Sequence, residues 1–261
     1  MRVAPTRIAM WSGPRNISTA MMRSFENRPD CAVVDEPFYA AYLAQAGLVH
    51  PMLHEVLASQ PTDWRGVADS LIGAAPGGAA VFYQKHMTHH MLADFGLDWS
   101  AACVNAFLIR DPAQVLASYV QKRADVTLED IGVVRQRELF ERETDRLGRA
   151  PVVVEGADVL ADPRGTLSSL CAALGIPFRD EMLAWPAGRR DSDGVWAPAW
   201  YSAVEASTGF SAPEQRAAPV LDDHLRRLAD EARPHYEALA KHKIGALPEH
   251  LSGRKREGPA R

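Results

Sequence analysis

The segment WSGPRNISTAMM, from Trp11 to Met22, combines residue types that bind phosphate groups. A short apolar run precedes it and helical spacing follows it, so the segment leads from a strand into the first turn of a helix. Amide groups at a helix N-terminus point outward without partners and attract anions. Arg15 adds a positive charge, and Ser18 and Thr19 add hydroxyl groups. The segment is a candidate phosphate-binding loop, although both hydroxyl residues would also cap an ordinary helix.

A second candidate phosphate ligand is Arg110, which ends the apolar run VNAFLIR and precedes Asp111 and Pro112. An aspartate N-cap followed by proline begins helices for structural reasons alone. Arginine at the carboxyl end of a buried strand has no such explanation, and ligands of open α/β sheets bind at that edge. Arg110 is therefore well placed to bind a phosphate through paired hydrogen bonds, with Ser118 two helical turns further along.

The loop lacks the strongest signature of magnesium-dependent phosphoryl transfer. The GxxxxGK[ST] pattern requires lysine directly before the hydroxyl residue, and Ile17 occupies that position. A P-loop kinase-like phosphotransferase remains an alternative, in which Ser18 and Asp35 would hold magnesium. A requirement for magnesium would favour that alternative.

These residues must be positioned by strands and helices that alternate along the chain. Five apolar runs predict strands at Arg7–Trp11, Cys31–Pro37, Ala79–Lys85, Val104–Arg110 and Pro151–Glu155. Helical spacing lies at Ile17–Phe25, around Val67–Ile72, from Pro112, at Leu128–Leu147 and at Pro213–Ala240. Continuous apolar strands separated by helices predict an α/β fold, a central parallel sheet flanked by helices on both faces.

The stretch Trp185–Phe210 has no periodicity and holds three of the six tryptophans. A loop of this length in a compact domain is functional or disordered, and tryptophan argues against disorder. Its side chains could stack on an adenine or cover an acceptor, or the tryptophans could only fix the loop to the domain. The side chains concerned are Arg189, Arg190, Trp196, Trp200 and Tyr201.

Length and composition predict one globular domain, spanning residues 1–251, followed by a disordered basic tail at residues 252–261. Of the 261 residues, 47% are hydrophobic, so a sizeable core can be buried. The net charge of −4 provides no basic field for nucleic acid or a membrane surface. The sequence shows no signal core or membrane span, and its three cysteines are scattered, so a cytoplasmic location is expected. The apolar stretch 39–57 could form a homodimer interface or simply cover the sheet.

Three segments, in the same order along the chain, resemble the sulfotransferase family. PRNIST resembles the family's PRxxxT loop for the 5'-phosphosulfate, and RDPAQVLAS resembles its RDPxxxxxS element for the 3'-phosphate. VVVEGADVLADPRGTLSSLCAALGIPF resembles a later stretch in which a strand ending in glutamate precedes a helix that begins with Asp-Pro. The resemblance covers most of residues 7–178 and implies a three-layer, P-loop-type α/β domain.

The resemblance also implies a reaction. The co-substrate would be 3'-phosphoadenosine-5'-phosphosulfate (PAPS), and the enzyme would pass its sulfonate to a hydroxyl or amine of a small-molecule acceptor without a metal. Arg15 would contact the bridging oxygen and stabilise the departing phosphate, whereas Arg110 and Ser118 would bind the 3'-phosphate. The residues that the resemblance assigns to the donor are Arg15, Asn16, Ile17, Ser18, Thr19, Arg110 and Ser118.

Two positions depart from the family pattern. Ile17 stands where the family commonly has glycine, and a β-branched residue does not adopt positive φ readily, so the loop must differ locally. Gly156 stands where the family usually has aspartate, a difference that we expect to matter little. A nucleotide-binding protein without catalysis is a further alternative, which tight donor binding without turnover would identify.

The resemblance leaves two candidates for the base that accepts the acceptor's proton. QKHMTHHML resembles the family's KxHLP segment and nominates His86, with His89 and His90 close by. VVDEPF nominates Glu36, because some bacterial family members that sulfonate sugars use a glutamate there. We favour His86 and retain Glu36; structurally, the first could be a surface histidine and the second a solvated turn residue. The histidines lack the HExxH order and have no nearby cysteine pair, so we expect no metal site.

Overall fold

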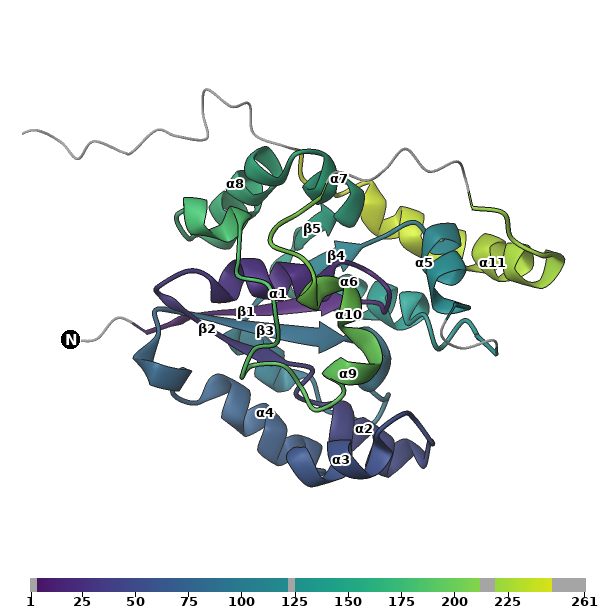
Figure 1. The fold of residues 1–261 in the computed structure, drawn as a ribbon, viewed down its shortest axis with the longest axis horizontal. Coiled ribbons are helices and arrows are strands. Elements are labelled where there is room, and N and C mark those ends of the chain that lie inside the picture. The colour runs from purple at the N-terminus through teal and green to yellow at the C-terminus, as the bar shows by residue number, and fades with distance from the viewer. Residues whose placement is uncertain (1–3, 122–124, 212–218, 246–261) are drawn as a thin grey trace, which may run out of the picture.

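The computed structural model describes residues 4–121, 125–211 and 219–245. At its centre is a five-stranded sheet in the order β2-β3-β1-β4-β5 (Figure 1). All four strand pairings are parallel. The strands are β1 Thr6–Ser12, β2 Cys31–Asp35, β3 Val81–Met87, β4 Val104–Ile109 and β5 Val152–Glu155. The predicted parallel α/β sheet is confirmed, and each strand lies within two residues of its expected position.

The central place of β1 in the sheet determines where a ligand can bind. After β1 the chain builds β2 and β3 on one side, and then crosses to build β4 and β5 on the other. In open α/β sheets, such a reversal leaves a crevice at the carboxyl ends of the strands. The loop after β1, which holds the predicted phosphate-binding residues, opens into this crevice.

One face of the sheet is covered by α1 Ser18–Glu26, α7 Gly156–Ala161 and α8 Pro163–Leu174. Met21, Met22 and Phe25 of α1 are fully buried against alternate side chains of the strands. The 3-10 turn Asp180–Leu183 also lies at this face, where Met182 is buried, and the 3-10 turn Pro76–Gly78 comes shortly before β3.

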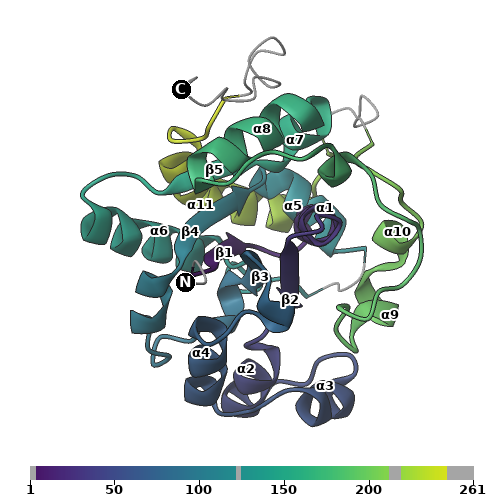
Figure 2. The same cartoon turned by 90° about the vertical axis from the view of Figure 1, so that its left-hand side faces the viewer.

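The opposite face is covered by α2 Tyr39–Ala46, α4 Trp64–Ile72, α6 Val133–Leu147 and the end of α11 Asp223–Ala240. Figure 2 shows α2, α4 and the short α3 Leu53–Ser59 gathered at one end of the molecule, and α7 and α8 at the other. Two 3-10 turns, Thr88–His90 and Asp98–Ala102, complete this side. Part of the apolar stretch 39–57 packs inside the domain, since Ala40 and Ala41 of α2 are fully buried.

Helix boundaries follow local capping chemistry. The side chain of Asp111 accepts a hydrogen bond from the Gln114 amide and begins α5 Pro112–Tyr119, as its Asp-Pro pair predicted. α6 begins at Val133 and not at Leu128, because Gly132 adopts a left-handed conformation with φ of 66° directly before it. α11 begins at Asp223, and part of the helical spacing expected from Pro213 lies outside the described residues.

The segment Trp185–Phe210, here called the aromatic segment, is ordered and contains the short helices α9 Ala197–Trp200 and α10 Ser202–Glu205. Trp185 and Trp196 are buried, so the tryptophans do fix the segment to the domain. An ion pair between Asp193 and Arg23 of α1, 2.7 Å apart, also holds the segment on the domain. The side chains of both residues are 0% exposed.

Other expectations lie outside what the structure describes. The tail at residues 252–261 is not among the described residues, and the domain boundary at residue 251 stays a prediction. None of the helices described has both the length and the apolar composition to cross a bilayer. Cys103 and Cys171 are buried as free thiols, and Cys31 is a partly buried free thiol.

We predict that Asp193→Ala lowers the free energy of unfolding by about 3 kcal/mol, because it removes the nearer of the two carboxylates that pair with the buried Arg23 guanidinium and leaves only Glu26 at 3.5 Å. Urea denaturation followed by circular dichroism measures this loss. The matched control is Asp180→Ala, which removes an exposed ion pair with Arg164 and should cost less than about 1 kcal/mol. Equal losses in the two variants would show that the Arg23 pair does not anchor the segment.

Candidate functional site

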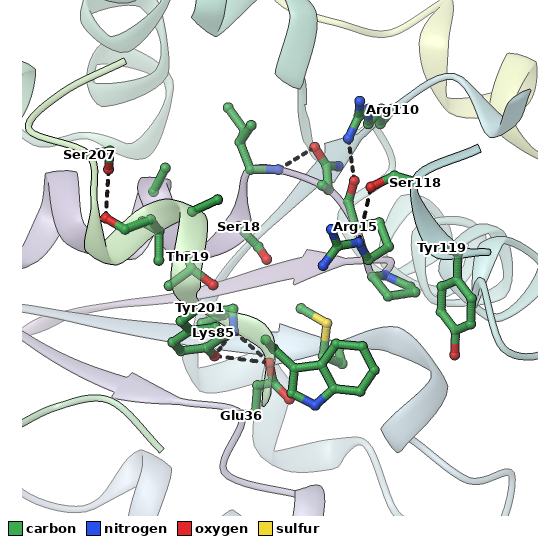
Figure 3. Close-up of a pocket in the computed structure, with 18 of the residues that line it drawn as sticks. Arg15, Ser18, Thr19, Glu36, Lys85, Arg110, Ser118, Tyr119, Tyr201 and Ser207 are labelled. Carbon is green, nitrogen blue, oxygen red and sulfur yellow. Dashed lines mark hydrogen bonds and ion pairs between the residues drawn. The ribbon is translucent and has the colours of Figure 1, made fainter. Parts of the chain in front are cut away.

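A cavity of 370 Å³ lies at the carboxyl ends of the strands, between the loop after β1, the ends of β2 and β3, and the aromatic segment. Eight of the nine predicted site residues line it: Arg15, Asn16, Ile17, Ser18, Thr19, Glu36, Arg110 and Ser118. His86 does not. In Figure 3, Arg15, Arg110 and Ser118 lie on one side of this space, and Glu36, Lys85 and Tyr201 lie on the other.

The loop after β1 presents the N-terminus of α1 to the cavity. Ile17 is the N-cap residue, and no side chain caps the first turn. Ser18 and Thr19, the first residues of the helix, line the cavity. An uncapped helix N-terminus provides amide donors and a positive dipole for an anion. This wall of the cavity is therefore suited to a phosphate-like group.

Ile17 fits in this loop because its own φ is negative and the positive φ lies on Arg15. Ile17 has φ of −82°, which suits a β-branched residue. The positive φ, 54°, falls on Arg15 instead. The backbone strain of this loop therefore lies on the residue that carries the charge.

Gly156 matters more than the sequence suggested. The Asn16 side chain braces the loop, since its Oδ1 accepts from the Ile17 amide at 2.9 Å and its Nδ2 donates to the Leu108 carbonyl at 3.2 Å. A Cβ atom at position 156 would lie 2.7 Å from Asn16 Oδ1, a distance that real Cβ atoms do not tolerate. Glycine at this position therefore makes room for Asn16.

Two arginines and a serine that are far apart in sequence meet beside the loop. Arg15 Nε donates a hydrogen bond to Ser118 Oγ at 3.1 Å. Arg110 Nη1 donates to the Arg15 carbonyl oxygen, and its Nη2 lies 3.5 Å from Gln114 Oε1. Burial lowers the pKa of Arg15, and the group remains a cation because an arginine is not deprotonated in proteins. The predicted phosphate ligands thus form one cationic wall.

The opposite wall carries a buried charge network formed by Asp35, Glu36, Lys85 and Tyr201. Lys85 Nζ donates to Asp35 Oδ1 at 2.8 Å, to Glu36 Oε1 at 2.6 Å and to the Tyr201 hydroxyl at 2.7 Å. Tyr201 in turn donates to Asp35 Oδ2 at 2.7 Å. The three donors of the ammonium group are therefore all used, and Asp35, which the kinase alternative assigns to magnesium, has protein partners on both oxygens.

Burial and mutual charge set the protonation of this network. Burial alone would lower the pKa of Lys85, but the Asp35 and Glu36 carboxylates outweigh it and the pKa is raised. Burial raises the pKa of Glu36 above its ordinary value of 4.5, Lys85 opposes the rise, and Asp35 adds to it. Burial also raises the pKa of Tyr201, whose hydroxyl stays protonated. Lys85 is thus a cation held between two carboxylates, one of which reaches the cavity.

Backbone strain also marks both walls. Three non-glycine residues in the described part of the chain have positive φ, and two of them, Arg15 and Glu36, line the cavity. Glu36 has φ of 41°. A non-glycine residue in this conformation costs about 1–3 kcal/mol and persists only where its surroundings fix it. The fold retains this strain at the two residues that carry the charge of opposite walls.

In the QKHMTHHML segment, His86 and His90 are buried and His89 is partly buried, and lowered pKa values keep all three neutral. His86 is 1% exposed and stacks on Trp11 with ring centroids 4.5 Å apart, with Trp99 also in contact. Burial lowers the pKa of His86 to about 3. Burial also lowers the pKa values of His89, to about 3, and of His90. The expectation of a surface histidine at position 86 was wrong, because its side chain points to the aromatic core and away from the cavity.

Within the described residues, no three side chains of histidine, cysteine, aspartate or glutamate gather to form a metal site. Three residues of the charge network, Asp35, Lys85 and Tyr201, were not among the predicted site residues, and His89 and His90 also line the cavity. Lys85 carries the same signal as Arg110, a charge at the carboxyl end of a buried strand, and so does Asp35. Tyr201 carries no such signal, since the aromatic segment brings it to the cavity from more than 100 residues away. Arg189 and Arg190 do not line the cavity.

Comparison with known proteins identifies similar sequences and folds. The chain matches the family of sulfotransferase domains over residues 6–243. It is 34% identical over 208 residues to branched-chain-amino-acid aminotransferase-like protein 2 of Arabidopsis thaliana, covering 80% of this chain and 37% of that protein. It is 34% identical over 238 residues to the like-named protein 1 of the same plant, covering 91% of this chain and 42% of that protein. The chain thus spans about two fifths of the length of these curated relatives.

Among solved structures, the sulfotransferase domain from the curacin biosynthetic pathway is similar, with a TM-score of 0.51 and 14% identity. The match covers 95% of this chain and 100% of that chain. At this identity the similarity concerns the fold, which is the parallel α/β sheet with helices on both faces.

We predict that His86→Phe reduces the loss of stability in acid. His86 binds a proton near pH 6.5 when unfolded but only near pH 3 when folded, so the free energy of unfolding falls as the pH drops through this range. Removing the group should lessen the fall by up to about 1.4 kcal/mol per pH unit. Urea denaturation at pH 7, 6, 5 and 4 measures both slopes. Equal slopes for variant and wild type would show that His86 is not held neutral.

Proposed function

The chain belongs to the sulfotransferase family, and on that premise we propose that it transfers the sulfonate of PAPS to a hydroxyl or amine of a small-molecule acceptor. The observation that carries this proposal is the pairing of two walls in one cavity. A cationic wall with an uncapped helix N-terminus faces a wall that presents a carboxylate, Glu36, beside a fixed ammonium group.

The cationic wall fits the donor's charges. PAPS carries a 5'-phosphosulfate and a 3'-phosphate, and the wall offers two kinds of anion ligand. The first turn of α1 offers amide donors, and Arg15, Arg110 and Ser118 meet beside it. We assign the 5' group to the loop of Arg15 through Thr19 and the 3'-phosphate to Arg110 and Ser118. The nucleotide supplies the sulfonate and leaves as 3'-phosphoadenosine-5'-phosphate (PAP).

The two walls divide the chemistry of transfer. The acceptor oxygen or nitrogen forms a bond to sulfur, the bond between sulfur and the bridging phosphate oxygen breaks, and the acceptor's proton passes to Glu36. Arg15, from the cationic wall, stabilises the negative charge that grows on the departing phosphate. Lys85 opposes the rise in the pKa of Glu36 that burial causes, and so favours the carboxylate form that accepts the proton.

Glu36 supports this role better than His86 does. Glu36 lines the cavity, and burial raises the pKa of its carboxyl group above the ordinary value, which makes the carboxylate a stronger base. His86 lies outside the cavity, and a pKa of about 3 makes it a weak base. We therefore propose Glu36 as the base.

The volume and lining of the cavity indicate the kind of acceptor that fits. The cavity volume of 370 Å³ falls in the range of small-molecule sites. Aromatic rings of Tyr39, Trp200 and Tyr201 line the part of the cavity near Glu36. These rings suit an acceptor with a flat or apolar body. A cytoplasmic location and a homodimer stay predictions.

We predict that isothermal titration with PAP, without metal, detects binding to the wild type that is weakened in Arg15→Ala and in Arg110→Ala. Each substitution removes charged hydrogen bonds to phosphate, so binding should weaken by about 10- to 100-fold. The control is Arg164→Ala, an exposed arginine outside the cavity. A wild type that ignores PAP, or variants that bind it equally well, would reduce the resemblance to one of fold, and ATP with magnesium would be tried next.

We predict that Glu36→Gln lowers kcat by about 10²- to 10⁴-fold and leaves PAP affinity unchanged, because the amide cannot accept the proton. Turnover is measured with ³⁵S-labelled PAPS and the best acceptor from a panel of hydroxyl and amine compounds. Wild-type activity should rise with pH through the raised pKa of Glu36, above 4.5, because only the ionised form is a base. This acid limb should be absent in Glu36→Gln.

The matched control for the base is His86→Phe, which should retain turnover. If His86→Phe abolishes transfer and Glu36→Gln does not, the assignment of the base is reversed. Tight PAP binding by the wild type without transfer to any acceptor would favour the non-catalytic alternative.

A further inference from the structure

The aromatic segment reaches the charge network through one side chain. Tyr201 is 5% exposed and lines the cavity beside Lys85 and Glu36. Its hydroxyl lies at the centre of a set of polar contacts, which is unusual for a residue of a covering loop. The contacts of this hydroxyl indicate what it contributes to the site.

The hydrogen-bonding capacity of the Tyr201 hydroxyl is fully used. It donates its one hydrogen to Asp35 Oδ2 at 2.7 Å, and it accepts from Lys85 Nζ at 2.7 Å and from Trp196 Nε1 at 3.0 Å. A hydroxyl has one donor and two acceptor positions, so these contacts leave it no rotational choice. Glu36 Oε1 lies 3.3 Å away. The hydroxyl is thus a fixed dipole within the network.

We propose that Tyr201 is a positioning residue for the transfer reaction, whose hydroxyl fixes the Lys85 ammonium between Asp35 and Glu36 and so orients the Glu36 carboxylate toward the acceptor. The role of Glu36 as base rests on the proposed function, whereas the positioning itself does not. The aromatic segment is then part of the active site.

The segment is anchored on the N-terminal side of Tyr201, so that the hydroxyl is held firmly. Gly194 N donates to Asp35 Oδ2 at 3.1 Å, the same carboxylate oxygen that accepts from Tyr201. The Trp196 ring packs so closely that a Cβ atom at position 194 would lie 2.1 Å from it. The buried Asp193–Arg23 pair fixes the preceding residue to α1, the helix whose N-terminus forms the cationic wall.

The Tyr201 hydroxyl accepts one of the three hydrogen bonds that the buried Lys85 ammonium group donates. An ammonium group has three donors, and Asp35, Glu36 and Tyr201 each take one. Without the hydroxyl, one N–H of a buried lysine loses its partner, and Lys85 is free to shift relative to Glu36. A buried polar group without a partner is costly, so the arrangement of the remaining three groups would change.

The charged and titratable groups that face Glu36 come from three elements. Asp35 precedes it on β2, Lys85 faces it from β3, and Tyr201 faces it from the aromatic segment. His90 Nδ1 lies 4.0 Å from Glu36 Oε2 and is neutral because burial lowers its pKa. Lys85 and the nearby Tyr201 hydroxyl both lower the pKa of Glu36, so removal of the hydroxyl that holds Lys85 in place should raise that pKa further.

The experiment compares Tyr201→Phe with the wild type and with the control Tyr236→Phe. The control removes a hydroxyl that also bonds a carboxylate, Glu155, at 2.7 Å, but outside the cavity. Carbon-detected NMR titration follows the Glu36 carboxyl signal, assigned by its loss in Glu36→Gln. Nitrogen-detected spectra follow Lys85 Nζ. Titration with PAP and the pH dependence of kcat complete the set.

We expect Tyr201→Phe to move the Glu36 titration and the acid limb of kcat to higher pH together, and to shift the Lys85 signal. We expect kcat to fall about tenfold or more, the worth of one charge-assisted hydrogen bond, with PAP affinity within about twofold of the wild type. Tyr236→Phe should change none of these. If Tyr201→Phe does not fold, Trp196→Phe, which removes only the donor to the hydroxyl, should give a smaller shift in the same direction.

Two outcomes separate this inference from the proposed function. Unchanged Glu36 and Lys85 signals in Tyr201→Phe would overturn it and leave the segment as a cover only, even if transfer is confirmed. A wild type that neither binds PAP nor transfers sulfonate would refute the proposed function, while the NMR titrations would still decide whether Tyr201 positions the network.

Discussion

The burial of the Lys85 ammonium is the constraint on which the site depends. A lone ammonium group in a protein interior would lose its proton or destabilise the fold. Here Asp35 and Glu36 lie within 2.8 Å of it, and the Tyr201 hydroxyl takes the third hydrogen. The network therefore requires the ends of β2 and β3 and the aromatic segment to be in place at once. It also explains why a loop rich in glycine and proline is ordered, because that loop completes the solvation of a buried charge.

The site has opposite electrostatic character on its two walls, and the sheet topology produces this separation. Parallel strands deliver their carboxyl ends to one edge, and β1 lies between β3 and β4. The loop after β1 and the residue after β4 provide the cations, whereas β2 and β3 provide the carboxylates with their internal lysine. Two strained residues, Arg15 and Glu36, stand on opposite walls. Strain of this kind is retained where a side chain must face a particular direction, and here both side chains line the cavity.

The histidines show how residue type can mislead about chemistry. His86 lies directly between the cavity-lining residues Lys85 and Met87, yet strand alternation turns it to the opposite face of the sheet. Its ring then packs with Trp11 and Trp99 as an apolar group would. His90 stacks on Tyr39 and Tyr42, with ring centroids 4.5 and 4.9 Å apart. Burial keeps these rings neutral: His86 packs in the aromatic core, whereas His90 packs on the tyrosine rings at the cavity wall.

The sequence by itself determined the order and nearly the positions of the five strands, since continuous apolar runs and Asp-Pro helix starts are local signals. It also placed the candidate phosphate-binding loop and Arg110 at one edge of the sheet, because residues at the carboxyl ends of parallel buried strands converge there. Only the tertiary structure decided which side of β3 faces the cavity, and thus that Lys85 and not His86 joins Glu36. The tertiary structure alone places Tyr201 beside Lys85 in the cavity and Gly156 against the side chain of Asn16. Those relations depend on contacts between segments far apart along the chain, and no local pattern of residues encodes such distances.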